Sequence, residues 1–481
     1  MTANSIAVLP TGLGKTVIAL LTMAEYLNRY KNEKCVILAP TRVLVHQHYN
    51  FLKDNLKIND DDISIITGED YINYRMERWE SKVICATPQI MNLDMKREIV
   101  RVESLSMIIF DEVHRAVGHY AYVPIAVEVY NRNKDARMIG MTASLPSDAS
   151  KVKEIMKVLR AKHIELRDHE SEDVKPYIQE TKIEWVRLDL PANIIEISTL
   201  LRKTLSEYVL VIRGAGFKLG DVPSLKAFLN LRQAVERQKK YETRAALYSS
   251  IRLVHAISLL ETQGVSSFLK FLDRLSKRKR VMGLKKLMDN KSFTEAYEIA
   301  RGSKLLGLEH PKITKLIDVV SSLDGNDKAI IFASYRDSVD EIYKWLIQNG
   351  YKAGILIGKS GETGQTQKEQ IESLERLKSG EYDILVATQV GEEGLDVSEC
   401  KLVVFYDNVS SAVRYVQRSG RTGRRQPGRV VAFIAKGTRD EVYFHLVKKR
   451  MEQSKRTAVQ FSRKTNDGLD MFMDKERDVF G

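Results

Sequence analysis

The sequence predicts an α/β fold in which two parallel-sheet domains are separated by an all-helical domain. Two observations predict it. Near both ends of the chain, apolar runs of four to six residues alternate with helical patterns, as expected for strands that are buried on both faces. Between these regions apolar residues recur only at helical spacing. With 481 residues, 43% of them hydrophobic and 29% charged, the chain is long enough to build several cores.

The first sheet domain is predicted to span residues 1–190. Its expected strands are short apolar runs, mostly flanked by Gly, Pro, Thr or Asp: 5–9, 35–39, 63–67, 83–86, 107–110 and 138–142. The cysteines Cys35, Cys85 and Cys400 lie at or within apolar runs and lack the spacing of metal ligands. We therefore expect buried thiols in a reducing compartment.

The helical domain is predicted to span residues 191–303, because strand-like runs disappear after Pro191. Alternation returns at about residue 312, with expected strands at 329–333, 353–357, 384–387, 402–406 and 430–434. A second sheet domain is therefore predicted over residues 304–450. Residues 451–481 are predicted to be a charged tail, with a helix followed by a loose end.

The chain is basic, with a formal net charge of +13. An excess of this size favours a polyanionic partner, nucleic acid first and a membrane surface second. The sequence has no stretch of eighteen apolar residues and no basic, apolar leader at its start. We therefore expect a cytoplasmic protein that makes no use of a membrane.

The segment PTGLGKT has the pattern of a phosphate-binding loop, because it follows an apolar run and precedes a helical one. Its glycines let backbone N–H groups and a helix N-terminus face phosphates. We expect Lys15 to reach the β- and γ-phosphates of ATP and the Thr16 hydroxyl to bind Mg²⁺. A glycine-rich turn without a ligand is the alternative. The expected nucleotide contacts are Pro10, Thr11, Gly12, Leu13, Gly14, Lys15 and Thr16.

Two adjacent acids, Asp111 and Glu112, end the apolar run at 107–110. At the end of a strand, both would reach the carboxyl edge of the sheet, beside the phosphate-binding loop. We expect Asp111 to hold Mg²⁺ through water and Glu112 to act as the general base for the attacking water. Two such acids alone usually form only a turn, but together with the loop they predict nucleotide hydrolysis.

A third segment, QRSGRTGR at 417–424, lies in the second sheet domain. Guanidinium groups can neutralise the charge of a γ-phosphate, so we expect Arg421 and Arg424 to act as arginine fingers from across a cleft. ATP would then close the two sheet domains and hydrolysis would open them. The alternative is a helix surface paired with acids.

Seven segments in this order resemble the motifs of superfamily 2 helicases of the DEAD/DEAH type. They are PTGLGKT (10–16), APTR (39–42), ATPQ (86–89), DEVH (111–114), TAS (142–144), ATQVGEEGLDV (387–397) and QRSGRTGR (417–424). Within that superfamily, DEVHRAVGHYAY (111–122), VGEEGLDV (390–397) and LVVFYD (402–407) are most similar to the archaeal Hef helicases and their FANCM relatives. The resemblance covers nearly the whole chain and implies two RecA-like domains around the helical insertion.

The resemblance also implies roles for further residues. Six would contact the sugar-phosphate backbone of one tracking strand: Thr41, Arg42, Thr87, Ser334, Arg336 and Thr388. Gly394 and Asp396 would touch the nucleotide from the second sheet domain, and Gln417 would order the γ-phosphate or its water. Thr142 and Ser144 would couple the nucleotide site to domain movement. Backbone contacts position a protein without selecting sequence, so we expect recognition of DNA shape.

The helical insertion carries a cluster of basic residues, Lys277, Arg278, Lys279, Arg280, Lys285 and Lys286. We expect them to form a thumb-like clamp that grips the phosphates of duplex or branched DNA. A solvated basic bundle without a ligand is the alternative.

The resemblance implies an ATP-dependent DNA helicase or translocase that acts on forked or branched DNA in replication-fork repair and moves 3′ to 5′. The motor motifs do not separate DNA from RNA, so an RNA helicase or double-stranded-RNA translocase is the alternative. A nucleotide-switched scaffold that holds a fork without moving is a third hypothesis. We expect a monomer that works with a separate nuclease or a replication clamp.

Two departures from the family pattern carry expectations of their own. Relatives have an adenine-recognising element well before the phosphate-binding loop, whereas nine residues precede Pro10 here. We therefore expect weak discrimination between ATP and GTP. The Glu-Arg-Lys-x-x-x-Asp motif of an XPF-type nuclease does not occur in the sequence, so we expect no DNA cleavage.

Overall fold

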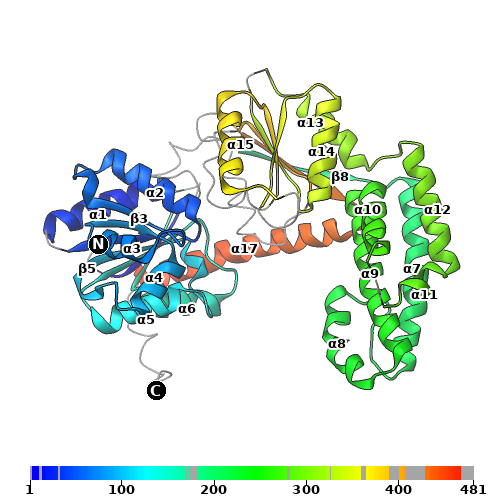
Figure 1. The fold of residues 1–481 in the computed structure, drawn as a ribbon, viewed down its shortest axis with the longest axis horizontal. Helices are drawn as coiled ribbons and strands as arrows, with labels where there is room; N and C mark the ends of the chain where they lie inside the picture. Colours follow the sequence, from blue (N-terminus) through cyan, green and yellow to red (C-terminus); the bar gives the residue numbers. More distant parts are fainter. Residues whose placement is uncertain are drawn as a thin grey trace.

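The computed structural model describes residues 3–9, 14–30, 33–167, 171–172, 181–278, 282–325, 327–358, 364–388, 400–407 and 428–466. Within these ranges it contains two parallel sheets, each flanked by helices, and a helical domain beside the second sheet (Figure 1). The predicted fold class is therefore confirmed. We call the first sheet with its helices lobe 1, the second lobe 2, and the helical domain the insertion.

In the described residues of lobe 1, seven strands form one sheet, in the order β3-β4-β2-β5-β6-β1-β7. Their bounds are β1 (Ser5–Val8), β2 (Lys34–Leu38), β3 (Ile63–Ile66), β4 (Val83–Ala86), β5 (Leu105–Asp111), β6 (Arg137–Thr142) and β7 (His163–Leu166). All neighbouring strands are parallel. The six expected strands are present, and β7 is an edge strand that we did not predict.

The helices of lobe 1 cover both faces of this sheet. Helices α1 (Lys15–Arg29) and α2 (Arg42–Asn55) pack on one face, and α4 (Pro88–Lys96), α5 (Tyr122–Arg132) and α6 (Ala149–Leu159) pack on the other. Helix α3 (Ile72–Arg78) follows β3, and three short 3-10 helices are η1 (Asp60–Asp62), η2 (Val102–Ser104) and η3 (Val113–Arg115). Successive strand residues alternate between the two cores, which explains the continuous apolar runs.

The insertion has a hydrophobic core of its own. Its helices are α7 (Ala192–Gly214), α8 (Leu225–Gln238), α9 (Tyr241–Gln263), α10 (Val265–Ser276), α11 (Leu284–Met288) and α12 (Lys291–Leu305). Helix α9 packs against α7, α8 and α10. It is therefore the central helix of the insertion, and most of its second half is buried.

Lobe 2 contains a second parallel sheet, with the order β10-β11-β9-β12-β13-β8 among the described strands. The bounds are β8 (Thr181–Leu188), β9 (Ala329–Phe332), β10 (Ala353–Leu356), β11 (Ile384–Ala387), β12 (Leu402–Phe405) and β13 (Gly428–Ala435). Helices α13 (Pro311–Val320) and α14 (Arg336–Gln348) cover one face. Helices α15 (Gln367–Ser379) and α17 (Arg439–Asn466) cover the other.

Strand β8 differs from the domain boundary that we predicted at residue 190. Residues 181–188 were placed in the first sheet domain, but β8 pairs with β13 along its whole length and is the edge strand of the second sheet. The chain thus joins lobe 2 before it enters the insertion. The last strand of lobe 1 is β7, which ends at Leu166.

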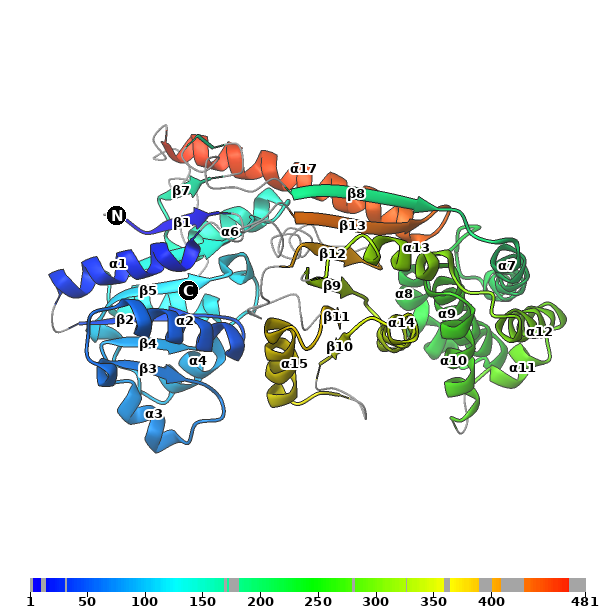
Figure 2. The same ribbon diagram turned by 90° about the horizontal axis from the view of Figure 1, so that it is seen from above.

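Helix α17 differs from the boundary that we predicted at residue 450, because it continues to Asn466. Figures 1 and 2 show it running from lobe 2 across to lobe 1. Val447 belongs to a core of lobe 2, whereas Ala458 belongs to a core of lobe 1. The segment predicted as a charged tail therefore begins as a helix that connects the lobes.

Two further expectations concern the whole chain. Cys35, Cys85 and Cys400 are buried thiols, as predicted. Across the described residues, every helix is too short or too polar to cross a membrane.

Candidate functional site

Three neighbouring strands of lobe 1 bring the candidate catalytic segments together. Strand β6 lies between β5 and β1, and all three are parallel. Because parallel strands end at the same edge, the segments after them meet there. These segments are the start of α1, the DEVH residues and the TAS residues.

The start of α1 has the geometry of an anion site. Gly14 caps the helix with a left-handed backbone, φ +83°, and the first turn contains no acid. The helix N-terminus therefore presents its partial positive charge without a competing carboxylate. Lys15 Nζ donates a hydrogen bond to the carbonyl of Leu9, 3.1 Å away. Pro10, Thr11, Gly12 and Leu13, which we predicted as nucleotide contacts, lie outside the described residues.

Asp111 is buried at the end of β5, and its carboxylate is held by two donors. His48 Nε2 lies 2.9 Å from Oδ2, and the backbone N–H of Glu112 donates to Oδ1 at 3.0 Å. Burial alone would raise the pKa of Asp111, but the hydrogen bond and charge of His48, together with the charge of Lys15, bring that pKa below its usual value. The carboxylate is therefore ionised and fixed in orientation.

His48 was not predicted to belong to the site. It lies on α2, whose buried residues are Val45, His48 and Leu52. Their helical spacing of three and four residues places His48 on the inward face. That spacing is the signal that could have indicated its contact with the sheet edge.

Glu112 has an unusual backbone for a residue with a side chain, φ +50° and ψ +49°. Its Oε2 is buried and lies 3.3 Å from His114 Nδ1, without the geometry of a hydrogen bond. A strained backbone beside a buried oxygen that lacks a hydrogen bond is typical of a functional position. This oxygen is available to accept a proton.

His114 connects the acids with the TAS segment. Its Nδ1 lies 3.0 Å from Thr142 Oγ1, and the Thr142 hydroxyl donates to the carbonyl of Ser144 at 2.9 Å. Because the hydroxyl has one proton, His114 Nδ1 must be the donor to Thr142. Glu112, His114 and Thr142 are thus linked through one imidazole.

Tyr122 stabilises the same edge of the sheet by contacting the ends of two strands. Its buried hydroxyl lies 2.6 Å from the carbonyl of Asp111 and 3.1 Å from that of Leu38, at the ends of β5 and β2. Its ring packs edge-on against Phe110, with 5.1 Å between centroids. Although Tyr122 ends the stretch that resembles Hef, its support of the acid-bearing strand was not predicted.

The candidate backbone contacts of lobe 1 follow β2 and β4, further along the same edge. The Thr41 hydroxyl caps α2 by accepting the N–H of Leu44 at 3.3 Å. Arg42 forms an ion pair with Glu69. Thr87 is buried between β4 and α4. The structure therefore brings these residues to one edge, with Arg42 already paired to an acid.

The candidate backbone contacts of lobe 2 also lie at one edge of its sheet. Ser334 and Arg336 follow β9, and Thr388 follows the adjacent β11. The N–H of Ser334 donates to the carboxylate of Asp407, and the guanidinium of Arg336 donates to the carbonyl of Gly358. The other predicted residues of lobe 2, namely Gly394, Asp396, Gln417, Arg421 and Arg424, lie outside the described residues.

The basic cluster of the insertion lies around the end of α10 and on α11. Lys277, Arg278, Lys285 and Lys286 are exposed, while Lys279 and Arg280 lie outside the described residues. Lys277 pairs with Asp273 at 2.8 Å, and Lys286 lies 3.7 Å from Glu242. Met282, which lies just before α11, is held to α9, because Arg252 donates to its carbonyl at 2.6 Å.

The described residues fit the two cofactors that the motifs imply. The α1 N-terminus and Lys15 suit the phosphates of ATP. Oxygen donors suit Mg²⁺, and the Thr16 hydroxyl and the ionised Asp111 supply them. The buried Glu112 Oε2 supplies an acceptor without a hydrogen bond of its own.

Two family models match the chain. Residues 1–152 match the DEAD/DEAH box helicase model, and residues 311–426 match the helicase conserved C-terminal domain. A solved structure, the Pyrococcus furiosus Hef helicase domain, aligns with a TM-score of 0.71 and 38% identity, covering 92% of this chain and 95% of that one.

Curated relatives match almost the whole chain but extend well beyond it. A Methanocaldococcus jannaschii protein provisionally named an ATP-dependent RNA helicase is 37% identical over 94% of the chain, which spans 58% of that protein. The ATP-dependent DNA helicase mph1 of Neurospora crassa is 30% identical over 92% of the chain, which spans 40% of that protein. The Fanconi anemia group M protein homolog of Mus musculus is also 30% identical over 92%, and the chain spans 24% of it.

Proposed function

Because the chain belongs to the superfamily 2 helicases of the DEAD/DEAH type, in the branch of Hef and the Fanconi anemia group M proteins, we propose that it is an ATP-driven motor on branched DNA. One observation carries the proposal. The α1 N-terminus, the pair Asp111–Glu112 and the linked Thr142 meet at the ends of three neighbouring strands. The groups that would bind phosphate, activate water and connect the site to the rest of lobe 1 thus lie at one edge of the sheet.

In the proposed mechanism, the N-terminus of α1 and Lys15 bind the β- and γ-phosphates. Thr16 and Asp111 would hold Mg²⁺, which neutralises charge on the phosphates. His48 keeps the Asp111 carboxylate ionised and oriented through their 2.9 Å contact. We assign His48 a positioning role, since its partner is the carboxylate.

Glu112 accepts a proton from the attacking water through its buried Oε2. His114 Nδ1 lies 3.3 Å from this carboxylate and donates to Thr142. Lobe 2 completes the site with Gln417, Arg421 and Arg424, which approach when ATP closes the lobes. Closure and reopening move the two groups of backbone contacts relative to each other, so hydrolysis becomes movement along one strand.

Hydrolysis by this site is tested with Glu112→Gln, which keeps the shape of the side chain and removes its basicity. We expect ATP turnover to fall about 10²- to 10⁴-fold and strand displacement to be lost, while fork binding is retained. The matched control is Glu128→Gln on α5, whose side chain is 46% exposed and lies 3.6 Å from Arg132. Strand displacement by Glu112→Gln at the rate of the unsubstituted chain would contradict the assignment.

The substrate is tested by a nucleic-acid panel. Names of fungal and mammalian relatives support DNA, whereas the archaeal relative named for RNA supports the alternative, an RNA motor. We expect forked DNA to stimulate ATP hydrolysis more than single-stranded DNA or double-stranded RNA at equal salt. Stronger stimulation by double-stranded RNA would favour the RNA motor, and no stimulation by any nucleic acid would exclude both.

The clamp role of the insertion is tested by replacing its six clustered basic residues with Ala. Each phosphate contact contributes about 0.9 to the slope of log affinity against log salt, so the slope of fork binding should become shallower. A smaller change, Lys285→Ala with Lys286→Ala, should reduce the slope by about 2. The control pair is Lys134→Ala with Lys151→Ala, which are exposed on lobe 1. An unchanged slope in the sixfold variant would contradict the clamp.

A further inference from the structure

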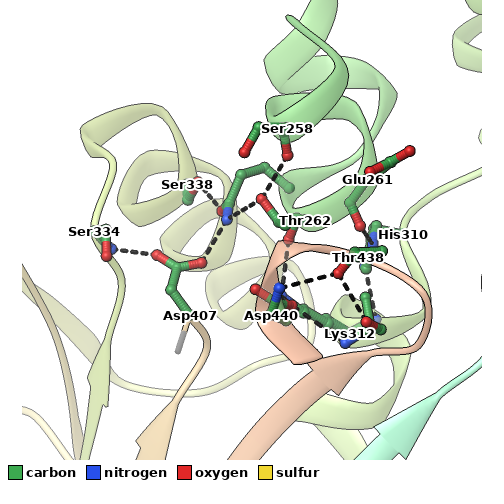
Figure 3. Close-up of polar contacts among 12 residues, drawn as sticks. Ser258, Glu261, Thr262, His310, Lys312, Ser334, Ser338, Asp407, Thr438 and Asp440 are labelled. Atoms are coloured by element: carbon green, nitrogen blue, oxygen red, sulfur yellow. Dashed lines mark hydrogen bonds and ion pairs between the residues drawn. The ribbon is translucent and has the colours of Figure 1, made fainter. Parts of the chain in front are cut away.

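The C-terminal end of α9 is inserted into lobe 2 through a buried polar network (Figure 3). Glu261, Thr262 and Gln263 end this helix and are buried. Three segments of lobe 2 contact them directly: the start of α13, α14 and the residues after β12. The residues after β9 join the network through Asp407, and the start of α17 joins it through Lys312. The lobe 2 side chains or backbone groups involved belong to His310, Lys312, Ser334, Ser338, Asp407, Thr438 and Asp440.

One half of this network attaches the insertion to lobe 2. His310 Nε2 donates to the carbonyl of Glu261 at 3.1 Å, and Lys312 Nζ donates to that of Thr262 at 2.9 Å. Lys312 is fully buried and pairs with Asp440 at 2.6 Å. Its charge lies against the negative end of the α9 dipole, so it satisfies carbonyls that a helix end leaves free.

The other half of the network is centred on the side chain of Gln263. Its Nε2 donates to Asp407 Oδ1, and its Oε1 accepts the hydroxyl of Ser338. The second oxygen of Asp407 accepts the N–H of Ser334. The carboxylate of Asp407, a residue that is 6% exposed, therefore joins the insertion to Ser334, two residues after β9.

The position of Asp407 in lobe 2 indicates the role of its contact with Gln263. Asp407 lies two residues after β12, and the next motif along the chain is the arginine segment 417–424. Ser334, held by the same carboxylate, is a candidate backbone contact for nucleic acid. Attachment of the insertion is already provided by His310 and Lys312, whereas Gln263 contacts Asp407 at the edge where β9 and β12 end.

We propose that Gln263 and Asp407 are positioning residues that couple nucleic-acid binding by the insertion to ATP hydrolysis. The proposal rests on the proposed function, since it requires a motor that nucleic acid stimulates. When nucleic acid binds the insertion, the force on it is transmitted along α9 to the C-terminal end of that helix. The Gln263 amide transfers it to Asp407, which follows β12 and holds the backbone N–H of Ser334 after β9.

The test uses the full chain with Gln263→Met, which keeps an unbranched side chain of similar length and removes both polar groups. Basal ATP hydrolysis, ATP hydrolysis at saturating forked DNA and the dissociation constant for the fork are measured together. We expect the ratio of stimulated to basal turnover to fall at least tenfold, while basal turnover and the dissociation constant stay within about twofold. A residue that only stabilises the fold would not lower this ratio in the folded enzyme.

The control is Ser267→Ala on α10, because this buried hydroxyl has no hydrogen-bond partner. Its ratio should equal that of the unsubstituted chain. Ser338→Ala removes one of the contacts of Gln263 and should lower the ratio about threefold, so the proposal stays testable if Gln263→Met folds poorly. An unchanged ratio in both variants, or basal turnover falling in proportion to stimulated turnover, overturns the coupling. If the unsubstituted chain itself shows no stimulation, the proposed function fails, and the coupling with it.

Discussion

Lobe 2 is joined to its two neighbours by contacts of different kinds. Toward the insertion, the buried Lys312, which pairs with Asp440 inside lobe 2, caps the end of α9 by donating to the carbonyl of Thr262. Toward lobe 1, α17 contributes two hydroxyl groups, those of Ser454 and Thr457, which donate to the carbonyls of Leu145 and Ser147. Ala458 and Phe461 add apolar contacts with the core of lobe 1.

The comparison indicates which junction can move. The buried charge of Lys312 needs both Asp440 and the carbonyl of Thr262 in place, so the junction with the insertion has one favourable arrangement. Hydroxyl–carbonyl hydrogen bonds contribute only about 1 kcal/mol each and exchange readily. We therefore expect the insertion to move with lobe 2 as one body, and the lobes to move relative to each other. The carbonyls that α17 contacts, those of Leu145 and Ser147, follow directly after Ser144 in the sequence. Movement of the lobes would therefore displace the residues next to the TAS segment.

The largest effect is expected for Lys312→Met, which leaves Asp440 buried without its cation. Breaking such a pair costs about 3–5 kcal/mol in the free energy of unfolding. Equilibrium unfolding in urea measures it. The control is Lys315→Met on the same helix, whose exposed pair with Asp318 has an N–O distance of 3.3 Å. Equal losses for the two variants would mean that the buried network does not hold the insertion.

The next effect concerns pH and His310. Burial, followed by the charge of Lys312, lowers the pKa of this imidazole to about 3, so it is neutral in the folded chain. The unfolded chain binds a proton below about pH 6.5, and stability is lost as pH falls from there toward 3. This group alone should cost about 2 kcal/mol between pH 7 and pH 5. A His310→Gln variant should lose less over that interval, and an identical pH profile would contradict the assignment.

A smaller effect is expected at the junction between the lobes. Ser454→Ala and Thr457→Val should each lower the free energy of unfolding by about 1 kcal/mol, because each leaves a carbonyl without its donor. Gln453→Ala and Gln460→Ala, exposed on the same helix, are the controls. Losses as large as that of Lys312→Met would remove the distinction between the two junctions.

The smallest effect should come from a surface pair that spans the junction with the insertion. Arg274 on α10 lies 2.6 Å from Asp337 on α14, with the Arg274 side chain 53% exposed. Exposed pairs contribute about 0–1 kcal/mol, so Arg274→Gln should change unfolding little. A loss near that of Lys312→Met, measured in the same urea series, would show that surface charge rather than the buried network joins these parts.

The expected strands were found because both faces of each are buried, which produces continuous apolar runs. Strands β7 and β8 were missed as parts of the sheets for the opposite reason. In β7, HIEL, His163 is exposed, and in β8, TKIEWVRL, polar residues interrupt the apolar ones. Both are edge strands, and the partner of β8 lies more than 200 residues away in sequence. No local pattern could assign it to the second sheet.

The candidate site was predictable where motif residues end neighbouring parallel strands, as Asp111 and Thr142 do. It was not predictable where a side chain acts through a backbone carbonyl or across a long sequence separation. Tyr122 supports β5 through the carbonyl of Asp111. Gln263 reaches Asp407 over 144 residues. Such contacts depend on how the domains assemble, which composition and periodicity do not record.

The path of α17 has a consequence for the synthesis of the protein. The last described strand of lobe 1, β7, ends at Leu166. The core of lobe 1 is completed by Ala458 and Phe461, which belong to α17. About 300 residues separate these two contributions. At about 5–20 residues per second, the ribosome takes about 15–60 s to synthesise the residues between them. During that interval the nascent lobe 1 exposes the apolar patch that α17 later covers, and such exposed patches favour aggregation.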